Sequence, residues 1–383
     1  MSQATAAGAW LPVYAQMPLV AVSGVGSWIV DDQGRRWLDA YGGHAVASTG
    51  HCHPHVVRAI QEQAARLIFY STAIPHRSRE ELAERIAERC PGDLSKVFFC
   101  NSGAEANENA LGLARKATGR QRVVSVEGGW HGRTAACLAV THGEKYEAGA
   151  RRAGLPLSEK VPFDDVAALD RLVDGNTAAL IVEPVQGMAG ARDCSPGFLR
   201  AARAACDRAG AALIFDEIQC GAGRAGAFTA AEVYGVTPDI LTLAKGLASG
   251  VPIGAMVATG AITAGIGVGD LGSTFGGGPV ACAAGLATLE VFDRENVFEN
   301  VRRIGARIRD WAAGRLPVQG LGLLLGLRLP PSRPAREVQR ALFAHRVLTG
   351  TAADPAVLRL LPPLTFSHDE AQLLLDRLDE VLP

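Results

Sequence analysis

Lysine is scarce in this 383-residue chain, where five lysines stand beside 33 arginines. The chain also has no charge imbalance, because its formal net charge is −1, so nothing predicts nucleic acid or an anionic membrane as a partner. No uninterrupted apolar run reaches the length of a membrane span, and MSQATAAGAW at the start has no signal-peptide pattern. We therefore expect a soluble, cytoplasmic protein whose partners are small molecules.

The eight cysteines include no CxxC pair, which predicts reduced thiols inside a cell rather than a disulfide framework. The segment HCHPH, residues 51–55, gathers three histidines and Cys52, a composition that invites a metal site. Its proline and the lack of a second ligand cluster make a closed four-ligand site hard to build. We predict no metal, and a metal-binding hydrolase or binding module is the alternative from another class of function.

Short apolar runs alternate with helical patterns in the middle of the chain, which predicts an α/β fold with a mostly parallel sheet. The candidate strands are residues 96–100, 122–126, 178–184, 211–217, 239–245 and 254–259. Between them lie helices such as 195–209, where Ser195 and Pro196 give a start signal.

The two ends of the chain do not show the alternation of strands and helices found in its middle. GSWIVDDQGRRWLDA, residues 26–40, predicts a hairpin that turns at DQG. A long helical stretch runs from Pro279, and a glycine-spaced strand pattern, a helix, the strand VLRLLPP and an amphipathic helix follow it. We expect a large cofactor-binding domain at 50–290 and a smaller α+β domain from both chain ends, 1–49 and 291–383.

Lys245 is the one lysine set among small and apolar residues, in LTLAKGLASG. A buried ammonium must be paired, neutralised or covalently engaged. Lysine can lose its proton, whereas arginine cannot, so a desolvated lysine can form a Schiff base with an aldehyde. The alternative is a lysine that snorkels to the surface at a strand end.

NSGAEANENALGLARKATG follows the strand at 96–100, and its alanine and leucine spacing predicts a helix that starts near Gly103 or Ala104. Ser102 and Gly103 then present free N–H groups to an anion, of which phosphate is the usual example. The alternative is that Ser102 is an ordinary helix cap.

AALIFDEIQ places Asp216 at the carboxyl end of a strand, the edge where open α/β sheets bind ligands. An ionised carboxylate there can hold a proton on a ring nitrogen, as a pyridine cofactor requires. Capping of the next helix is the alternative. Glu217 is expected to point to the opposite face, so the two residues do not form an acid/base pair.

Two glycine-rich segments add further groups. In GGWHGRT, residues 128–134, Trp130 offers a flat apolar face and Arg133 a fork suited to a carboxylate. GSTFGGGPVAC, residues 272–282, carries the hydroxyls of Ser273 and Thr274 before a helix. Each segment alone is unspecific, but together these residues supply the parts of one site.

In order and spacing, these parts resemble the class III aminotransferases, which are fold type I pyridoxal-phosphate enzymes that include acetylornithine and ornithine aminotransferases. The likeness runs from GHCHP (50–54) through NSGAEANE, WHGRT, EPVQG, DEIQ, LAKGL, PIGAM and GSTFGG to LRLLPPL (358–364). It implies a large domain with a mostly parallel, seven-stranded type of sheet, pyridoxal 5'-phosphate as cofactor, and a homodimer with shared active sites.

The resemblance also implies roles for single residues. In the cofactor site it implies Lys245 for the Schiff base, Asp216 for the pyridine nitrogen, Gln219 beside the ring hydroxyl, Trp130 stacked on the ring, Ser102, Gly103 and Ala104 around the phosphate, and Thr274 for the phosphate of the neighbouring subunit. In the substrate site it implies the two carboxylate-binding residues Arg133 and Arg359, with Ser273, His44 and Met188 nearby.

Three departures from the family pattern concern the substrate. Met188 stands where many members have a glutamate that pairs the second arginine, Gly278 stands where they have asparagine, and His44 stands where some have tyrosine. Methionine is expected to leave Arg359 without the glutamate partner, so that the arginine either turns to water or binds a second carboxylate.

We predict transamination from the terminal amine of an ornithine- or lysine-like donor, best N-acetylornithine in arginine biosynthesis, to 2-oxoglutarate. Carrier-linked lysine, succinylornithine and 4-aminobutyrate-like donors are alternatives, and a racemase or decarboxylase on the same fold is a further one.

Overall fold

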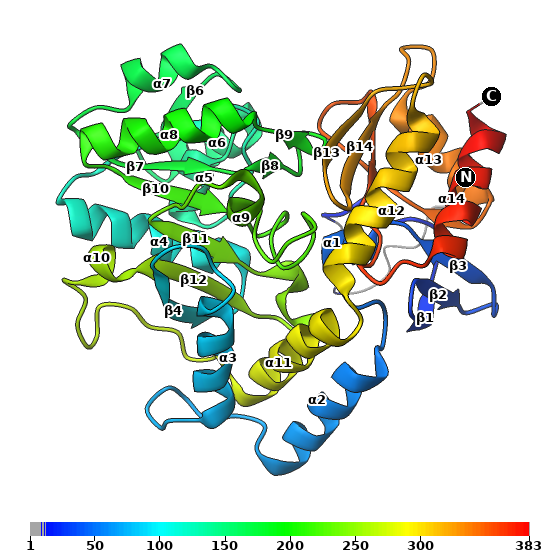
Figure 1. Ribbon diagram of the computed structural model, residues 1–383, viewed down its shortest axis with the longest axis horizontal. Coiled ribbons are helices and arrows are strands. Elements are labelled where there is room, and N and C mark those ends of the chain that lie inside the picture. The colour runs from blue at the N-terminus through cyan, green and yellow to red at the C-terminus, as the bar shows by residue number, and fades with distance from the viewer. Residues whose placement is uncertain (1–8, 10, 12, 383) are drawn as a thin grey trace.

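The structure is a computed structural model that describes residues 9, 11 and 13–382 (Figure 1). Part of the N-terminal segment predicted at 1–49 therefore lies outside the described residues. Among those described, no helix has both the length and the apolar character needed to cross a membrane.

A seven-stranded sheet forms the centre of the larger part of the molecule, as the resemblance implies, and six of its strands are among those predicted from the residues. Its order is β4-β12-β11-β10-β7-β5-β6, and β12 alone runs antiparallel to its neighbours. The strands are β4 (Leu94–Cys100), β5 (Arg122–Val126), β6 (Glu159–Val161), β7 (Thr177–Val182), β10 (Ala212–Asp216), β11 (Ile240–Leu243) and β12 (Gly254–Thr259). All of β7 is buried, which explains its continuous apolar run.

Helices cover both faces of this sheet (Figure 1). They are α4 (Gly103–Thr118), α5 (Ala135–Val140), α6 (Glu144–Arg152), α7 (Val166–Leu172), α8 (Pro196–Ala209), α9 (Ala230–Tyr234) and α10 (Gly260–Thr263). Helix α8 begins where the sequence predicts, because the Ser195 side chain accepts a hydrogen bond from the Phe198 N–H at 3.1 Å and Pro196 takes the first helical position.

Three helices pack together beside β4: α2 (Pro54–Arg66), α3 (Arg77–Ala87) and α11 (Pro279–Arg294) (Figure 1). The helical stretch predicted from Pro279 is interrupted, because a second helix, α12 (Val297–Ala312), begins after a break. Asn296 has a φ of 47° at this break. Asparagine tolerates the left-handed conformation better than most residues, so the chain turns there without glycine or proline.

Two four-stranded sheets lie at the other end of the molecule with the last helices, α13 (Ala335–Ala344) and α14 (His368–Val381) (Figure 1). One has the order β1-β2-β3-β15 and the other β13-β14-β17-β16. Their strands are β1 (Ala21–Val25), β2 (Trp28–Asp31), β3 (Arg36–Asp39), β13 (Val318–Leu321), β14 (Leu324–Arg328), β15 (Val347–Leu348), β16 (Gly350–Thr351) and β17 (Val357–Leu360). The predicted hairpin is β2–β3, and the glycine-spaced pattern forms a second hairpin, β13–β14.

The HCHPH segment runs into the first residues of α2, and each of its three histidines contacts a different carboxylate. His51 Nε2 lies 2.7 Å from Asp39, while His53 and His55 reach Glu295 at 2.9 Å and Glu290 at 2.7 Å. In the part of the chain that the structure describes, no three His, Cys, Asp or Glu side chains are grouped as ligands of one metal ion. The segment therefore ties the start of α2 to the C-terminal part of α11.

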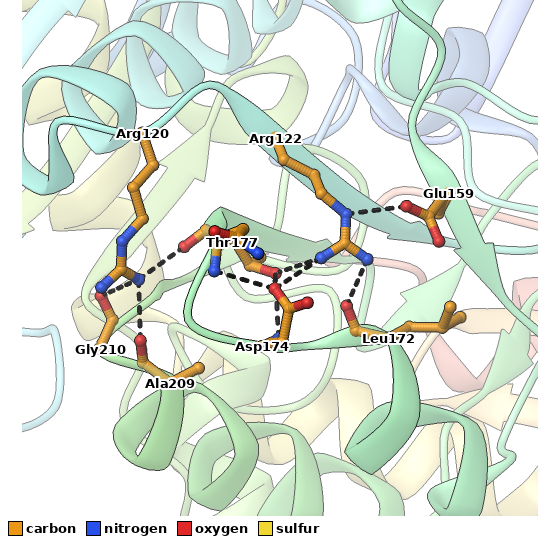
Figure 2. Close-up of polar contacts among 9 residues, drawn as sticks. Arg120, Arg122, Glu159, Leu172, Asp174, Thr177, Ala209 and Gly210 are labelled. Carbon is orange, nitrogen blue, oxygen red and sulfur yellow. Dashed lines mark hydrogen bonds and ion pairs between the residues drawn. The ribbon is translucent and has the colours of Figure 1, made fainter.

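The amino ends of β5, β6 and β7 are joined by arginine contacts (Figure 2). Arg120 donates to the carbonyl oxygens of Thr177, Ala209 and Gly210 at 3.0, 2.8 and 3.1 Å. Arg122 bridges Glu159 and Asp174 at 2.8 and 2.7 Å. This edge of the sheet is thus closed by polar contacts, and the residues with candidate chemical roles lie at the opposite, carboxyl edge.

Candidate active site

A cavity of about 510 Å³ opens at the carboxyl ends of β4, β5, β10 and β11. Nine of the residues predicted for the site line it: Ser102, Gly103, Ala104, Trp130, Arg133, Met188, Asp216, Gln219 and Lys245. Four predicted residues do not line it, namely His44, Ser273, Thr274 and Arg359. Segments far apart in the sequence therefore meet here because their strands end at one sheet edge.

Lys245 begins a short 3₁₀-helix directly after β11, with a φ of 37° that turns its side chain into the cavity. Its amine has no hydrogen-bond or ion-pair partner among residues 13–382. Burial lowers the pKa of Lys245, and the carboxylates of Asp216 and Glu183 oppose that shift. An amine that is desolvated and free of partners is suited to attack an aldehyde, and its place in the cavity argues against the snorkelling alternative.

Asp216 ends β10 and is 3% exposed. Its Oδ2 accepts hydrogen bonds from Asn107 Nδ2 at 2.7 Å and from His131 Nδ1 at 2.8 Å, and its Oδ1 accepts from the Ile218 N–H at 3.1 Å. Asn107 Oδ1 in turn accepts from the Thr242 hydroxyl at 2.8 Å. The carboxylate is therefore oriented by three donors and does not cap a helix.

Asn107, His131 and Thr242 are functional candidates that the sequence reasoning missed. A signal was present for two of them. Asn107 follows Gly103 by one helical turn on the helix whose start lines the cavity, and His131 directly follows Trp130. Thr242 has no local signal, because it lies inside the apolar strand β11.

The N-terminus of α4 lines the cavity through Ser102, Gly103 and Ala104. The Ser102 hydroxyl accepts a hydrogen bond from the Glu105 N–H at 3.2 Å, so Ser102 is a helix cap as the alternative reading held. Gly103 lies against Ile218, since an added Cβ would come within 2.7 Å of Ile218 Cδ1. The cap leaves the first N–H groups of a 16-residue helix available to an anion in the cavity.

Trp130 stands on one wall of the cavity, held by contacts to its backbone and its ring. Its N–H donates to Glu183 Oε1 at 2.6 Å, and the Tyr146 ring meets the indole edge-on at 4.6 Å between centroids. The exposed Arg133 lies with its guanidinium carbon 5.3 Å from the indole centroid. An aromatic face and a cation at the cavity mouth thus stand next to each other.

Gln219 Oε1 is buried without a hydrogen-bond partner within the described residues. The amide packs against Gly187, where any Cβ would overlap it. A buried acceptor without a donor is expected to bind a ligand hydroxyl or N–H. Together with the free amine, the oriented carboxylate and the helix N-terminus, it fits a pyridine ring that carries an aldehyde, a hydroxyl and a phosphate.

Two further carboxylates are buried near Asp216. Glu183 accepts from the N–H groups of Trp130 and Gly187, and burial together with the Asp216 charge raises its pKa. Burial raises the pKa of Glu217 to about 8, although it accepts from the N–H groups of Ala230 and Ala231. Glu217 therefore serves the start of α9 and not the cavity, in line with the predicted opposite faces.

Arg359, on β17, is 1% exposed and has partners that the sequence did not reveal. Its Nε donates to the Thr351 carbonyl at 2.8 Å, its Nη1 to the Gly187 carbonyl at 3.0 Å and its Nη2 to the Tyr41 hydroxyl at 2.9 Å. The expectation that Arg359 turns to water is wrong, but Arg359 does lack a carboxylate partner among the described residues, and its binding of a second carboxylate stays a prediction. The arginine is held by neutral oxygens instead.

Ser273 and Thr274 do not line the cavity of their own chain. The Ser273 hydroxyl accepts from Asn101 Nδ2 at 3.2 Å and from the Gly276 N–H at 3.1 Å, whereas Thr274 is exposed. His44 is half-buried, with its Nδ1 2.6 Å from the Tyr41 hydroxyl. Burial, with help from Arg359 and Lys245, lowers the pKa of His44 to about 4, so it is neutral at pH 7.

Comparison with known proteins gives a consistent result. The family model described as "Aminotransferase class-III" matches residues 11–382. Acetylornithine aminotransferase from Methanopyrus kandleri is 42% identical over 373 residues, which cover 96% of this chain and 95% of that protein. The enzyme of the same name from Methanosarcina mazei is 38% identical over 378 residues, covering 97% of this chain and 93% of that protein.

Among solved structures, the ornithine aminotransferase of Toxoplasma gondii ME49 superposes with a TM-score of 0.90 at 32% identity, covering 97% of this chain and 92% of that one. A second structure of the T. gondii enzyme, with a TM-score of 0.89 and 32% identity over 97% of this chain and 90% of that one, has PLP at partial occupancy in its active site.

Proposed function

Because this chain belongs to the class-III aminotransferases, which use pyridoxal 5'-phosphate, we propose that it transfers the terminal amino group of N-acetylornithine to 2-oxoglutarate. The observation that carries the transamination is the partner-free amine of Lys245 in the same cavity as the oriented carboxylate of Asp216. The choice of donor follows the curated relatives, which are acetylornithine aminotransferases at 38–42% identity.

When bound, the cofactor supplies an aldehyde and an electron-withdrawing ring. The residues of this chain would hold it as follows: the amine of Lys245 at the aldehyde, the carboxylate of Asp216 at the ring nitrogen, Gln219 Oε1 at the ring hydroxyl, the α4 N-terminus at the phosphate, and Trp130 at the ring face. Asp216 keeps a proton on the ring nitrogen, because its three donors stabilise the charged carboxylate. Lys245, with a lowered pKa, both accepts and returns a proton at Nζ.

Two arginines are proposed to bind substrate carboxylates. Arg133 is exposed at the cavity mouth beside Trp130, and Arg359 is buried next to Gly187, the residue that precedes Met188 in the cavity wall. Guanidinium groups bind carboxylates through two parallel N–H donors, which orients as well as attracts the substrate. We assign the single carboxylate of N-acetylornithine to Arg133.

A donor screen tests this function. The purified holoenzyme is mixed with 2-oxoglutarate and each donor in turn, and glutamate formation is measured. N-Acetylornithine is expected to give the highest kcat/KM, above succinylornithine, 4-aminobutyrate and a carrier-linked lysine. A higher value for any of these would replace the proposed donor, and absence of transfer from every donor would refute an aminotransferase.

A homodimer is proposed from an apolar surface near Thr274. Large side chains stay exposed there, with Ile68 at 70% and Phe275 at 63%, and the rings of Phe69 and Phe275 lie 5.0 Å apart. Exposed apolar groups that cluster in this way mark interaction sites. A second copy would bring Thr274 to the phosphate of its neighbour. Light scattering should give twice the mass of the chain, and Ile68→Lys should give monomers without activity.

The domain division proposed here follows sheet membership. Every strand of the seven-stranded sheet lies between Leu94 and Thr259, inside the large domain at 50–290, whereas β3 and β15 join the chain ends 1–49 and 291–383 in one sheet. A cytoplasmic location is supported by eight free cysteines. Cell fractionation tests the location, and limited proteolysis tests the boundary near residue 290.

A further inference from the structure

Arg359 is a buried cation without a carboxylate partner. It is 1% exposed, and none of the described Asp or Glu side chains lies within 4 Å of its guanidinium. Buried charges are normally paired, because an isolated charge is costly to remove from water. Three of its five N–H donors are used by neutral oxygens, which leaves one N–H on each terminal nitrogen for another acceptor.

The Tyr41 side chain is built into this site. Its ring fills the space beside Gly350, where any added Cβ would overlap it. The guanidinium carbon of Arg359 lies 5.6 Å from the ring centroid, and the hydroxyl lies 2.9 Å from Nη2. The Tyr41 N–H is in turn held by Asp39 Oδ1 at 2.9 Å. The hydroxyl is thus fixed by ring packing and by a backbone contact.

The backbone that follows Tyr41 is strained. Gly42, Gly43, His44 and Ala45 have φ values of 58°, 56°, 75° and 63°, all in the left-handed region. Such conformations cost of order 1 kcal/mol or more for residues other than glycine, and they persist only where the surrounding structure holds them in place. This left-handed turn places the His44 ring against the Tyr41 hydroxyl, with Nδ1 at 2.6 Å.

The direction of these hydrogen bonds can be assigned. An arginine only donates, so the Tyr41 oxygen accepts from Nη2. The tyrosine proton then goes to Nδ1 of His44, which is neutral. The array Arg359 to Tyr41 to His44 therefore contains no negative charge, and it orients the guanidinium without neutralising it.

Met188 lies next in the chain to Gly187, which contacts Arg359. It lines the cavity, and the carbonyl of the preceding Gly187 holds Arg359 Nη1. Its thioether carries no charge and its side chain is unbranched, so it moves aside at low cost. The Gly187 carbonyl thus holds Arg359 one residue from this part of the cavity wall, and no described carboxylate lies within 4 Å of the guanidinium.

We propose that Tyr41 is a positioning residue that holds Arg359 as a permanent receptor for one carboxylate of a dicarboxylic substrate. This inference rests on the proposed function for the identity of that substrate, glutamate or 2-oxoglutarate. A carboxylate partner would have to be released from Arg359 each time such a substrate enters. A tyrosine hydroxyl does not compete for the charge, so Arg359 is ready in both half-reactions.

The test measures binding of two ligands that cannot react. Glutarate has two carboxylates and pentanoate one, and their dissociation constants are measured by calorimetry on the holoenzyme. The unmodified protein should bind glutarate at least tenfold more tightly than pentanoate. Equal affinities would overturn the inference whether or not any variant folds.

Tyr41→Phe removes the hydroxyl and keeps the ring. It should weaken glutarate about tenfold and raise the KM for 2-oxoglutarate by a similar factor, with pentanoate binding and the cofactor absorbance unchanged within twofold. Tyr234→Phe is the matched control, because Tyr234 is partly buried and its hydroxyl makes no hydrogen bond to the described residues. The Tyr234→Phe variant should bind both glutarate and pentanoate with unchanged dissociation constants.

Unchanged glutarate binding in Tyr41→Phe, or equal weakening of both ligands, would refute the positioning role. The proposed function fails separately, because a different best donor in the screen leaves the glutarate result as it stands.

Discussion

His131 Nδ1 lies 2.8 Å from Asp216 Oδ2, and both side chains are buried, at 2% and 3% exposure. The carboxylate accepts this bond, so the histidine is the donor. Asn107 donates to the same oxygen at 2.7 Å. Asp216 therefore has a fixed direction before any ligand arrives, which is the preorganisation that electrostatic catalysis requires.

Asp216→Asn should keep the cofactor and lose most of the rate. The amide cannot hold a proton on a ring nitrogen, and its NH₂ would face either the two donors Asn107 and His131 or, in the other orientation, the Ile218 N–H. Loss of one preorganised electrostatic partner costs about a hundredfold or more in kcat. Stopped-flow kinetics of the half-reaction with N-acetylornithine measures this. A variant within a few-fold of the unmodified rate would leave Asp216 only a structural role.

Lys245→Ala should abolish transamination and the absorbance of the bound cofactor together, because the other four lysines lie outside the cavity. Borohydride reduction followed by peptide mass spectrometry should place the cofactor on Lys245. Lys160→Ala is the control, since Lys160 pairs with Glu147 at 3.0 Å. Cofactor found on Lys160 or Lys96 would overturn the assignment.

Met188→Glu should place a carboxylate near Arg359 and neutralise the charge that Tyr41 leaves available. We expect kcat/KM for glutamate to fall about fivefold relative to that for N-acetylornithine, which corresponds to roughly 1 kcal/mol of differential transition-state binding. Met188→Gln is a neutral control of the same size as glutamate. If the ratio of the two specificity constants stays constant, residue 188 does not set the donor preference.

His44 should make stability depend on pH. Its pKa is lowered from 6.5 to about 4 in the folded protein, mainly by burial, so the unfolded chain binds more protons between these values. Its contribution is therefore present above pH 6.5 and is lost as the pH falls toward 4, by about 2 kcal/mol at pH 5. Denaturant unfolding at pH 7 and 5, at one protein concentration, measures the loss.

The matched variant for that experiment is His44→Asn, because asparagine tolerates the left-handed φ of 75° at this position. The variant should lose less stability than the unmodified protein between pH 7 and pH 5. Parallel curves for the two proteins would show that His44 does not account for the pH dependence.

Arg120→Met should reduce the free energy of unfolding by about 1–3 kcal/mol, since the carbonyls of Thr177, Ala209 and Gly210 lose a charged donor. Activity should not change, because this network lies at the amino ends of β5, β6 and β7, whereas the cavity lies at the carboxyl edge of the sheet. Arg115→Met is the control, as Arg115 makes one exposed contact to the Gln121 carbonyl. Equal destabilisation by both would show that the three carbonyl contacts of Arg120 do not account for the effect.

Local signals in the sequence predicted much of the fold. Six of the seven strands of the central sheet were predicted, because β7 and its neighbours are buried, whereas the three-residue edge strand β6 was missed. Helix α8 was predicted because Ser195 and Pro196 encode its start. The break at Asn296 was missed because it depends on a left-handed residue that is neither glycine nor proline.

In the site, too, residues with a local sequence signal were predicted and residues without one were missed. Lys245 and Asp216 stand out because a charged residue at the end of an apolar run is costly without a purpose. The contact of Tyr41 with Arg359 joins residues 318 positions apart, and no periodicity or motif encodes it. Partners of this kind come from the tertiary structure alone, which is why the sequence suggested an unpaired arginine.

The parallel pairing of β15 with β3, Val347 beside Leu38, also constrains how the chain folds during synthesis. The hairpin β2–β3 is complete early, but one edge stays unpaired until nearly the whole protein has left the ribosome. An open strand edge is a template for association with other chains. The contact of Tyr41 with Arg359 also requires β17, so the segment around Tyr41 is among the last to reach its final conformation.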